Sequence, residues 1–145
     1  VGSEMCIRDR GCRNVSKLFI PIGFDIKKII HGFDEFEKIK FHHKYLNNLN
    51  YYKTIKILNN EKFIDGKFFL MSESKRFTPP ISEIYYEFYE NEKELIEYIK
   101  TKSDNLQCIV SNSISENHVN FGDTQNPKLS DYADNIDTIK FLLTN

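Results

Sequence analysis

The stretch GCRNVSKLFIPIG, residues 11–23, decides the fold expected for this chain. Residues 17–22 are largely apolar and end at Pro21 and Gly23, so we predict a buried strand there. Cys12 lies in the short polar turn before that strand, which is where an α/β enzyme presents a nucleophile. The segment begins abruptly for a domain, so we interpret the chain as the back half of an enzyme.

Two helices followed by a hairpin are expected in the residues that follow. A helix over residues 26–36, capped by Asp25, is predicted by apolar residues at helical spacing: Ile26, Ile29, Ile30, Phe33 and Phe36. Residues 41–60 form a second helical stretch, in which several asparagines favour a break near the middle. Asp65-Gly66 predicts a hairpin that joins residues 63–64 to 67–71.

The second half of the chain repeats the alternation of strand and helix. A polar loop at 72–80 precedes a strand at 81–89, where apolar and polar residues alternate. Asn91 and Glu94 open a predicted helix through Lys102. The remaining segments are predicted as a strand at 106–110, a long polar loop at 111–128, a helical turn at 131–137 and a final strand at 138–143. Strands alternating with helices imply an α/β layered domain with flanking helices and a largely parallel sheet.

Charge and composition argue against a nucleic-acid-binding, membrane-spanning or secreted protein. The 145 residues carry a net charge of −1, which gives no electrostatic footprint for nucleic acid or an anionic membrane. No apolar run approaches the roughly 18 residues that a membrane span needs, and no secretory signal is recognised. The three cysteines lack metal or CxxC spacing, which favours a reduced, cytoplasmic chain with no metal site.

Residues 1–10, VGSEMCIRDR, have no apolar period. They resemble the translated sequencing-adapter read-through of metagenomic assemblies, in which case Cys6 is not a native residue. The other interpretation is a genuine surface segment. We therefore expect a non-native leader at 1–10 and a partial catalytic domain at 11–145.

Cys12 is the first candidate for chemistry. A thiolate attacks carbonyl carbon and also leaves well, which suits acyl transfer through a thioester. Arg13 could favour the thiolate, and the backbone N–H groups of Asn14 and Val15 could stabilise an oxyanion. From the residues alone, a small buried hydrophobe remains the competing interpretation.

Four segments carry a resemblance to a known family: GCRNVSKLFIPIGFD (11–25), PPISEIYYEFYENEKELIEYI (79–99), LQCIVSN (106–112) and FGDTQNPKLSDYADNIDTIKFLL (121–143). They resemble the acyl-CoA reductase family, LuxC-like fatty-acyl reductases of the aldehyde dehydrogenase superfamily. The resemblance implies that Cys12 takes the acyl group from a fatty acyl-CoA or an acylated protein, and that NADPH then reduces the enzyme thioester to a fatty aldehyde. It also places Phe121 and Gly122 in a loop near the substrate mouth.

The chain departs from that family in its cofactor residues. It has no glycine-rich fingerprint, and in the family the dinucleotide-binding half lies upstream of the cysteine. The counterpart of the superfamily's Glu-x-Phe-Gly-Pro motif falls at residues 75–80. There Phe77 and either Pro79 or Pro80 match, but no glutamate does. The residues that bind NADPH are therefore expected mainly outside this chain, and the chain alone is expected to be inactive.

Other candidates have weaker patterns. We interpret His42 and His43 as a solvated helix face, His118 as an exposed loop residue and Cys108 as an inert core thiol. Four aromatic residues line either the core or an acyl channel: Tyr85, Tyr86, Phe88 and Tyr89.

Two other functions remain open. One is a non-catalytic α/β module for binding or oligomerisation, in which residues 138–143 form an edge strand shared between identical subunits. The other is a thiol hydrolase or acyltransferase, which would need His42, His43 or His118 as its base.

Overall fold

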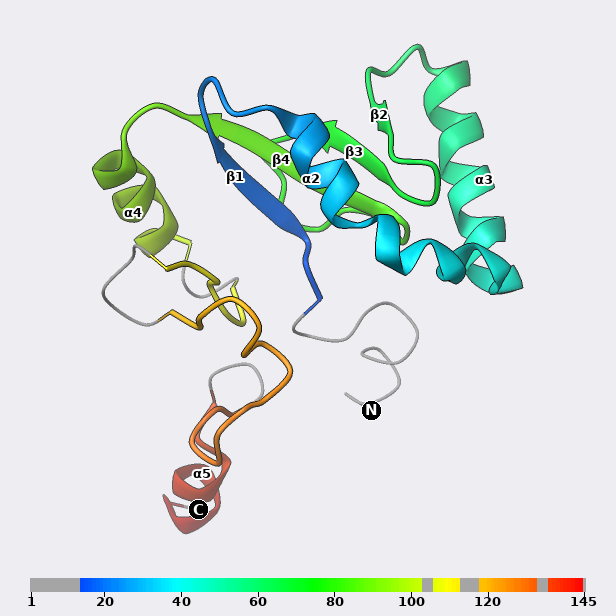
Figure 1. Ribbon diagram of the computed structural model, residues 1–145. Coiled ribbons are helices and arrows are strands. Elements are labelled where there is room, and N and C mark those ends of the chain that lie inside the picture. Colours follow the sequence, from blue (N-terminus) through cyan, green and yellow to red (C-terminus); the bar gives the residue numbers. More distant parts are fainter. Residues whose placement is uncertain (1–13, 103–105, 113–117, 133–135, 145) are drawn as a thin grey trace. The chain divides into compact units, whose positions relative to one another are not determined.

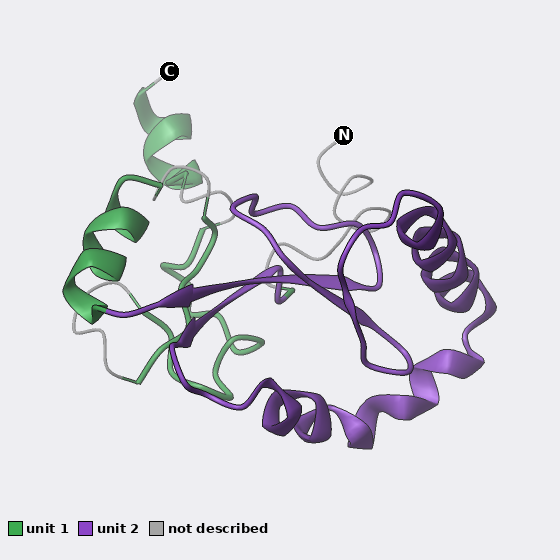
Figure 2. Ribbon diagram, turned by 90° about the horizontal axis from the view of Figure 1, so that it is seen from above, with its two compact units in different colours: residues 1–14, 91–145 green, residues 15–90 purple. Residues whose placement is uncertain are grey.

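The structure of the chain is a computed structural model that describes residues 14–102, 106–112, 118–132 and 136–144. The chain divides into two compact units (Figure 2). One unit is Val15–Glu90, and the other combines Val1–Asn14 with Asn91–Asn145. Each is described by itself below.

A four-stranded mixed sheet organises the unit Val15–Glu90 (Figure 1). The strands are β1 (Lys17–Pro21), β2 (Ile64–Asp65), β3 (Leu70–Glu73) and β4 (Glu83–Tyr89), in the spatial order β1-β4-β3-β2. β4 pairs in parallel with both β1 and β3, whereas β2 pairs antiparallel with β3. The predicted α/β class with flanking helices is confirmed, and both parallel pairings are made by the interior strand β4.

The apolar core lies on one face of this sheet. Phe68, Phe69 and Met71 form a buried cluster, and Met71 has no exposed surface. Helix α2 (Ile26–Gly32) contributes three isoleucines to that cluster, and the strands contribute alternate residues. The surrounding side chains are Leu18, Ile26, Ile29, Ile30, Phe33, Ile64, Ile84 and Tyr86. Burying a side chain the size of Met71 stabilises the fold by about 1.5–3 kcal/mol.

Helix α2 begins as predicted but ends early. The Asp25 side chain accepts a hydrogen bond from the Lys27 backbone N–H, which confirms the N-cap. The helix stops at Gly32, and a 3₁₀-helix, η1 (Asp34–Phe41), follows it. Phe36 is 56% exposed, so the prediction that it belongs to the helix's inward face is wrong. Gly32 has low helix propensity, which accounts for the end of α2 at that position.

Helix α3 (His43–Leu58) is continuous, so the predicted break at its asparagines is wrong. The Asn48 side-chain amide donates to the Lys44 carbonyl one turn back, so this polar side chain bonds within the helix instead of ending it. Leu49 is buried, with Tyr45 and Tyr52 half-buried on its side, as the spacing predicts.

The predicted hairpin is present with a longer connection. Asp65 pairs with Leu70, and the Gly66 N–H donates to the Phe69 carbonyl at 2.9 Å. A Cβ at Gly66 would lie 2.6 Å from the Phe69 ring, so a larger residue would displace that ring from the core. Asp65-Gly66 therefore marks the turn correctly, but the turn spans residues 66–69 instead of two residues.

Helix α4 (Glu92–Lys100) confirms the predicted cap in the other unit. Asn91 accepts from the Lys93 N–H, and its amide donates to the Glu94 carboxylate at 3.2 Å. Ile99 is buried, with Leu95 and Ile96 half-buried, although the helix ends before the predicted Lys102.

Two predicted strands in this unit are wrong. The segment 106–110 forms only an isolated bridge, Val110 to Val119. Residues 138–143 lie in a helix, α5 (Thr138–Thr144), because Asp137 caps it by accepting from the Lys140 N–H at 2.9 Å. The predicted helical turn at 131–137 lies partly outside the described residues.

Candidate functional site

Cys12 lies outside the described residues, as do Cys6 and the predicted leader at 1–10. The described residues begin at Asn14, shortly after Cys12. The Ser16 carbonyl accepts from the Tyr85 N–H at 3.0 Å, and β1 begins at the next residue, Lys17. The chain that follows Cys12 is thus hydrogen-bonded to the central strand β4.

Phe121 and Gly122, the residues predicted to lie near the substrate, are in an exposed turn. Phe121 is 68% exposed, and Gly122 follows it with a positive φ of 92° in a turn that the Asp123 N–H closes on the Asn120 carbonyl. Cys108 is half-buried and forms no disulfide among the described residues, and it lies in an irregular segment instead of the predicted strand.

A buried lysine joins β1 to the connection between β3 and β4. Lys17 donates to the Glu87 carboxylate at 2.6 Å, and its side chain is 2% exposed. The ammonium lies 4.6 Å from the centre of the Phe77 ring and 4.9 Å from that of Phe19, a favourable cation–π arrangement. Phe77 lies in the segment 75–80 where the sequence resemblance predicted a motif counterpart, and Pro79 in the same segment is buried. The Phe77 ring therefore packs against the Lys17 ammonium of β1.

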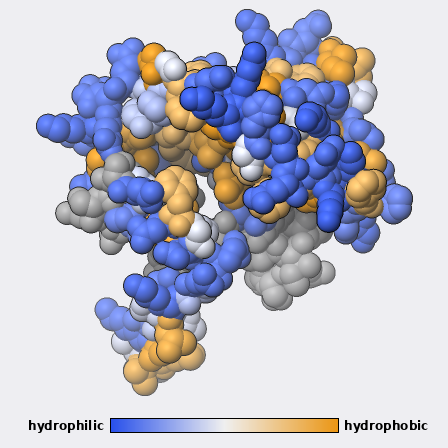
Figure 3. Space-filling view, viewed as in Figure 1, coloured by the Kyte–Doolittle hydropathy of each residue, from blue (hydrophilic) through white to orange (hydrophobic). Residues whose placement is uncertain are grey.

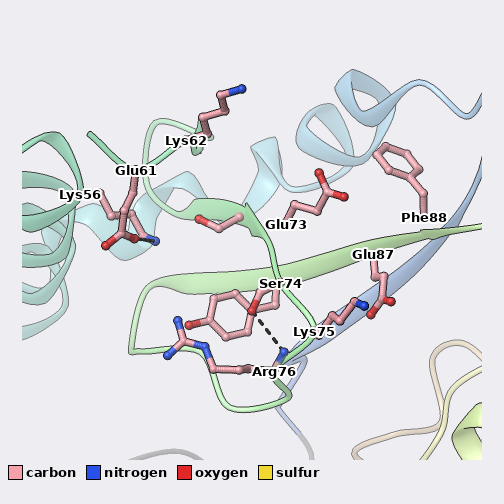
Figure 4. Close-up of a pocket in the computed structure, with 11 residues that line it drawn as sticks. Lys56, Glu61, Lys62, Glu73, Ser74, Lys75, Arg76, Glu87 and Phe88 are labelled. Atoms are coloured by element: carbon pink, nitrogen blue, oxygen red, sulfur yellow. Dashed lines mark hydrogen bonds and ion pairs between the residues drawn. The ribbon is translucent and has the colours of Figure 1, made fainter. Parts of the chain in front are cut away.

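The unit Val15–Glu90 has an open groove of about 660 Å³ (Figure 4). Its walls come from the end of α3, the segment before β2, β3 with the connection that follows it, and β4. A volume of a few hundred Å³ is typical of small-molecule sites. Two lining residues, Tyr85 and Phe88, are among the four aromatic residues for which the sequence left a core or an acyl channel open, whereas Tyr86 packs against the core cluster.

One end of the groove is built on a buried ion pair. Lys56 is 7% exposed, and its ammonium lies 2.9 Å from the Glu83 carboxylate and 3.1 Å from that of Glu61. Burial by itself lowers the pKa of Lys56, but hydrogen bonds to Glu83 and Glu61 outweigh it and raise that pKa above its usual value. The pKa of Glu61 is lowered, first by a hydrogen bond from Asn59 and next by Lys56.

Two residues that carry hydroxyl groups are neighbours in the register of the sheet at this end. Ser72 on β3 pairs with Tyr85 on β4, and both line the groove. Ser72 is 5% exposed, and its hydroxyl has no hydrogen-bond partner among the described residues. Burial, followed by the charge of Glu83, raises the pKa of Tyr85.

The connection after β3 supplies positive charge. The Arg76 guanidinium lies 5.5 Å from the centre of the Tyr85 ring, and the Arg76 N–H donates to the Ser74 hydroxyl at 3.2 Å (Figure 4). Lys75 is adjacent on the same connection, and Lys62 lies on the groove wall before β2. Within the described part of the chain, none of these three cations lies in an ion pair.

The alternation of residues in β4 misassigned which of its side chains are buried. Glu83 and Tyr85 lie on the polar side of the predicted alternation in β4, yet they are 2% and 3% exposed. Phe88, on the apolar side, is 37% exposed, which does not fit a core role. The signal that could have found the site is the serine on β3 followed by a Lys-Arg pair in the loop.

The histidines follow the sequence interpretation in part. His42 and His43 are exposed at the start of α3, where the His42 ring accepts from the Tyr45 N–H at 3.4 Å. His118 is half-buried instead of exposed. Among the residues that the structure describes, no three His, Cys, Asp or Glu side chains gather into a metal-binding group. Within the same residues, no helix is long and apolar enough to cross a membrane.

No protein-family model, curated protein or solved structure matches this chain.

Proposed function

We propose that this chain is the C-terminal part of an NADPH-dependent acyl-thioester reductase of the aldehyde dehydrogenase type, with Cys12 as its acyl acceptor. The observation that carries the proposal is the run of residues 11–25, which resembles the active-cysteine segment of acyl-CoA reductases. The order of elements after Cys12 supports it: strand β1, a turn at Gly23, then helix α2. The resemblance also implies a cytoplasmic enzyme that acts on a fatty acyl-CoA or an acylated protein.

The step assigned to this chain is acyl transfer. The Cys12 thiolate attacks the carbonyl carbon of the acyl thioester and forms a new carbon–sulfur bond. The bond to the donor's sulfur breaks, and the donor leaves as a thiolate that takes up a proton. Sulfur suits this step because the product thioester stays electrophilic enough for later reduction.

The described residues do not fit NADPH. A dinucleotide pyrophosphate binds at a glycine-rich helix N-terminus, where free N–H groups and the helix dipole attract it. The N-terminus of α2 after β1 is instead occupied by the Asp25 carboxylate, which accepts from the Lys27 N–H. In this proposal the hydride donor belongs to residues outside the described ones.

Mass spectrometry after incubation with palmitoyl-CoA tests the acyl-transfer step, which precedes reduction and therefore does not require the chain alone to complete a turnover. We expect a thioester-linked palmitoyl group on the peptide that contains Cys12, and its loss in Cys12→Ala. Cys108→Ala is the matched control and should label normally, because Cys108 lies in an irregular segment that the proposal leaves out of the reaction. Labelling that persists in Cys12→Ala would overturn the assignment.

A second candidate, a non-catalytic module that assembles with copies of itself, is favoured by helix α5. Its apolar residues are exposed, among them Leu142 at 70% and Leu143 at 81%, and they gather at the red end of the chain (Figures 1 and 3). This candidate predicts a concentration-dependent mass in light scattering that Leu142→Ser and Leu143→Ser abolish, with no palmitoyl transfer to Cys12.

A further inference from the structure

We propose that the outer side of α2, η1 and the first turn of α3 docks on the surface of an anionic lipid bilayer. These elements follow one another along one side of the unit Val15–Glu90 (Figures 1 and 2). We call this region the η1 surface; its exposed residues are Phe36, Ile39 and Phe41 with Lys27, Lys28, Lys38 and Lys44. The proposal concerns residues that acyl transfer does not use, so it stands whether or not Cys12 is a nucleophile.

Large apolar side chains are exposed on η1. Phe36 is 56% exposed, Ile39 40% and Phe41 73%. A 3₁₀-helix has three residues per turn, so Phe36 and Ile39 lie one above the other, and Phe41 lies in the neighbouring row with Lys38. The row that contains Glu37 is half-buried there. The two outward rows therefore place apolar and basic side chains next to one another, and exposed apolar patches of this kind mark interaction surfaces.

The η1 surface is positive, although the whole chain carries −1. Two nearby carboxylates are neutralised within the unit, because Glu37 lies 2.7 Å from the Lys40 ammonium and Asp34 lies 3.5 Å from that of Lys67. The carboxylates that remain are Glu35 and the N-cap of α2, Asp25.

Four lysines face those two carboxylates. Lys27, Lys28, Lys38 and Lys44 are exposed, and none of their ammonium groups forms an ion pair with the residues that the structure describes. The surface thus keeps two more positive than negative charges after internal pairing. A basic surface with apolar side chains among its lysines fits the boundary between anionic headgroups and acyl chains.

A lipid surface fits these residues better than a nucleic acid or a second copy of the chain. Every cation of the η1 surface is a lysine, which acts as a point charge and lacks the fork with which arginine grips single phosphates and base edges. In a two-fold dimer the same lysines would face one another across the interface, which is repulsive. A bilayer has no such repulsion, and it accepts the Phe41 ring while lysines reach the headgroups.

Flotation of the 145-residue protein with lipid vesicles tests the proposal. We expect binding to vesicles made of equal parts of phosphatidylcholine and phosphatidylserine. Pure phosphatidylcholine vesicles should bind at least about tenfold more weakly, because they lose the attraction of the excess positive charge. Equal binding to both vesicles, or binding to neither, would overturn the proposal. Binding of a single-stranded oligonucleotide as tightly as the anionic vesicles would also overturn it, in favour of a nucleic-acid surface.

A single tryptophan can report on insertion, because the chain has none. In Phe41→Trp we expect the fluorescence to shift to shorter wavelength on the anionic vesicles, since the exposed ring enters the interface. Leu58→Trp is the matched control: Leu58 at the end of α3 is 75% exposed and lies outside the η1 surface. A shift in both variants, or in neither, would contradict the proposal.

Charge variants separate this surface from net charge. Lys38→Gln with Lys44→Gln should weaken binding to the anionic vesicles by more than about tenfold. Lys62→Gln with Lys75→Gln is the matched control: it removes the same charge from two exposed lysines outside the η1 surface and should leave vesicle binding nearly unchanged. Equal weakening in the two double variants would contradict the proposal. A dimer in the absence of vesicles that Phe41→Ser abolishes would assign the surface to a second copy and overturn it.

Discussion

The two units of this chain bury their apolar residues very differently. Val15–Glu90 has a sheet whose central strands pair in parallel, and Leu70 and Met71 in it have no exposed surface. In the described part of the other unit, Ile99 of α4 is buried, while the apolar residues of α5 are 58% to 81% exposed. Hydrogen-bonded strands bring distant residues together and build a core, whereas two short helices and an isolated bridge bury much less.

The largest expected effect comes from breaking the buried ion pair of the first unit. Lys56→Ala should destabilise Val15–Glu90 by about 3–5 kcal/mol, because the Glu83 side chain is 0% exposed and would keep an uncompensated charge. Urea denaturation followed by circular dichroism measures this loss.

Lys53→Ala is the matched control from the same helix. Lys53 forms an ion pair with Asp65, and the two side chains are 39% and 42% exposed. The free energy of unfolding should therefore fall by less than about 1 kcal/mol. Equal losses of unfolding free energy in Lys56→Ala and Lys53→Ala would show that the buried ion pair stabilises the fold no more than the exposed one.

A cavity in the core sharpens the same comparison. Met71→Ala should cost about 2–5 kcal/mol, because Met71 is 0% exposed and packs against Phe68 and Phe69. Hydrogen exchange should show the loss of protection in β3 and β4. If the amides of α4 lost protection to the same degree, the two units would unfold together as one cooperative body.

Acid should weaken the first unit through its paired carboxylates. The pKa of Asp34 is lowered, first by its hydrogen bond with His31, and that of Glu37 by its hydrogen bond with Lys40. A lowered folded-state pKa stabilises the fold above the unfolded pKa of about 4 and loses that stability as pH falls through the lower folded value.

The Tm should therefore decline as the pH falls below about 4, modestly because both groups are exposed. In Glu37→Gln with Asp34→Asn the decline should be shallower. If the Tm of that double variant declined with pH as steeply as that of the original protein, Asp34 and Glu37 would not be the carboxylates that cause the acid sensitivity.

The smallest effect is expected in α5. Leu142→Ala should change stability by less than about 0.5 kcal/mol, since this residue is already 70% exposed. Thermal denaturation of the dilute protein provides the measurement. A loss of stability as large as that of Met71→Ala would mean that Leu142 of α5 is buried in solution.

Sequence patterns predicted the elements whose signals are local. The Asp25 and Asn91 caps, the turn at Asp65-Gly66 and strand β1 follow from a few neighbouring residues. The helix α5 was missed because a single capping residue, Asp137, outweighs the strand-like composition of the residues after it.

The polar lining of the groove was not predicted, because its burial depends on tertiary packing. In the sequence, Lys56 is indistinguishable from a surface lysine. Its ion pair with the buried Glu83 forms only when α3 packs against the sheet. Ser72 and Tyr85 become neighbours only when β3 and β4 align in parallel. The predicted nucleophile Cys12 lies outside the described residues, so that prediction still depends on the resemblance of its segment.

The reactivity of Cys12 tests the central claim most directly. The alkylation rate of Cys12 and of Cys108 can be followed across pH in the same sample by peptide mass spectrometry. An acyl-accepting nucleophile predicts that Cys12 reacts faster, with a midpoint well below the value of about 8.5 for a free thiol. A Cys12 midpoint at that ordinary value, with no rate advantage over Cys108, would contradict the assignment of Cys12 as the nucleophile.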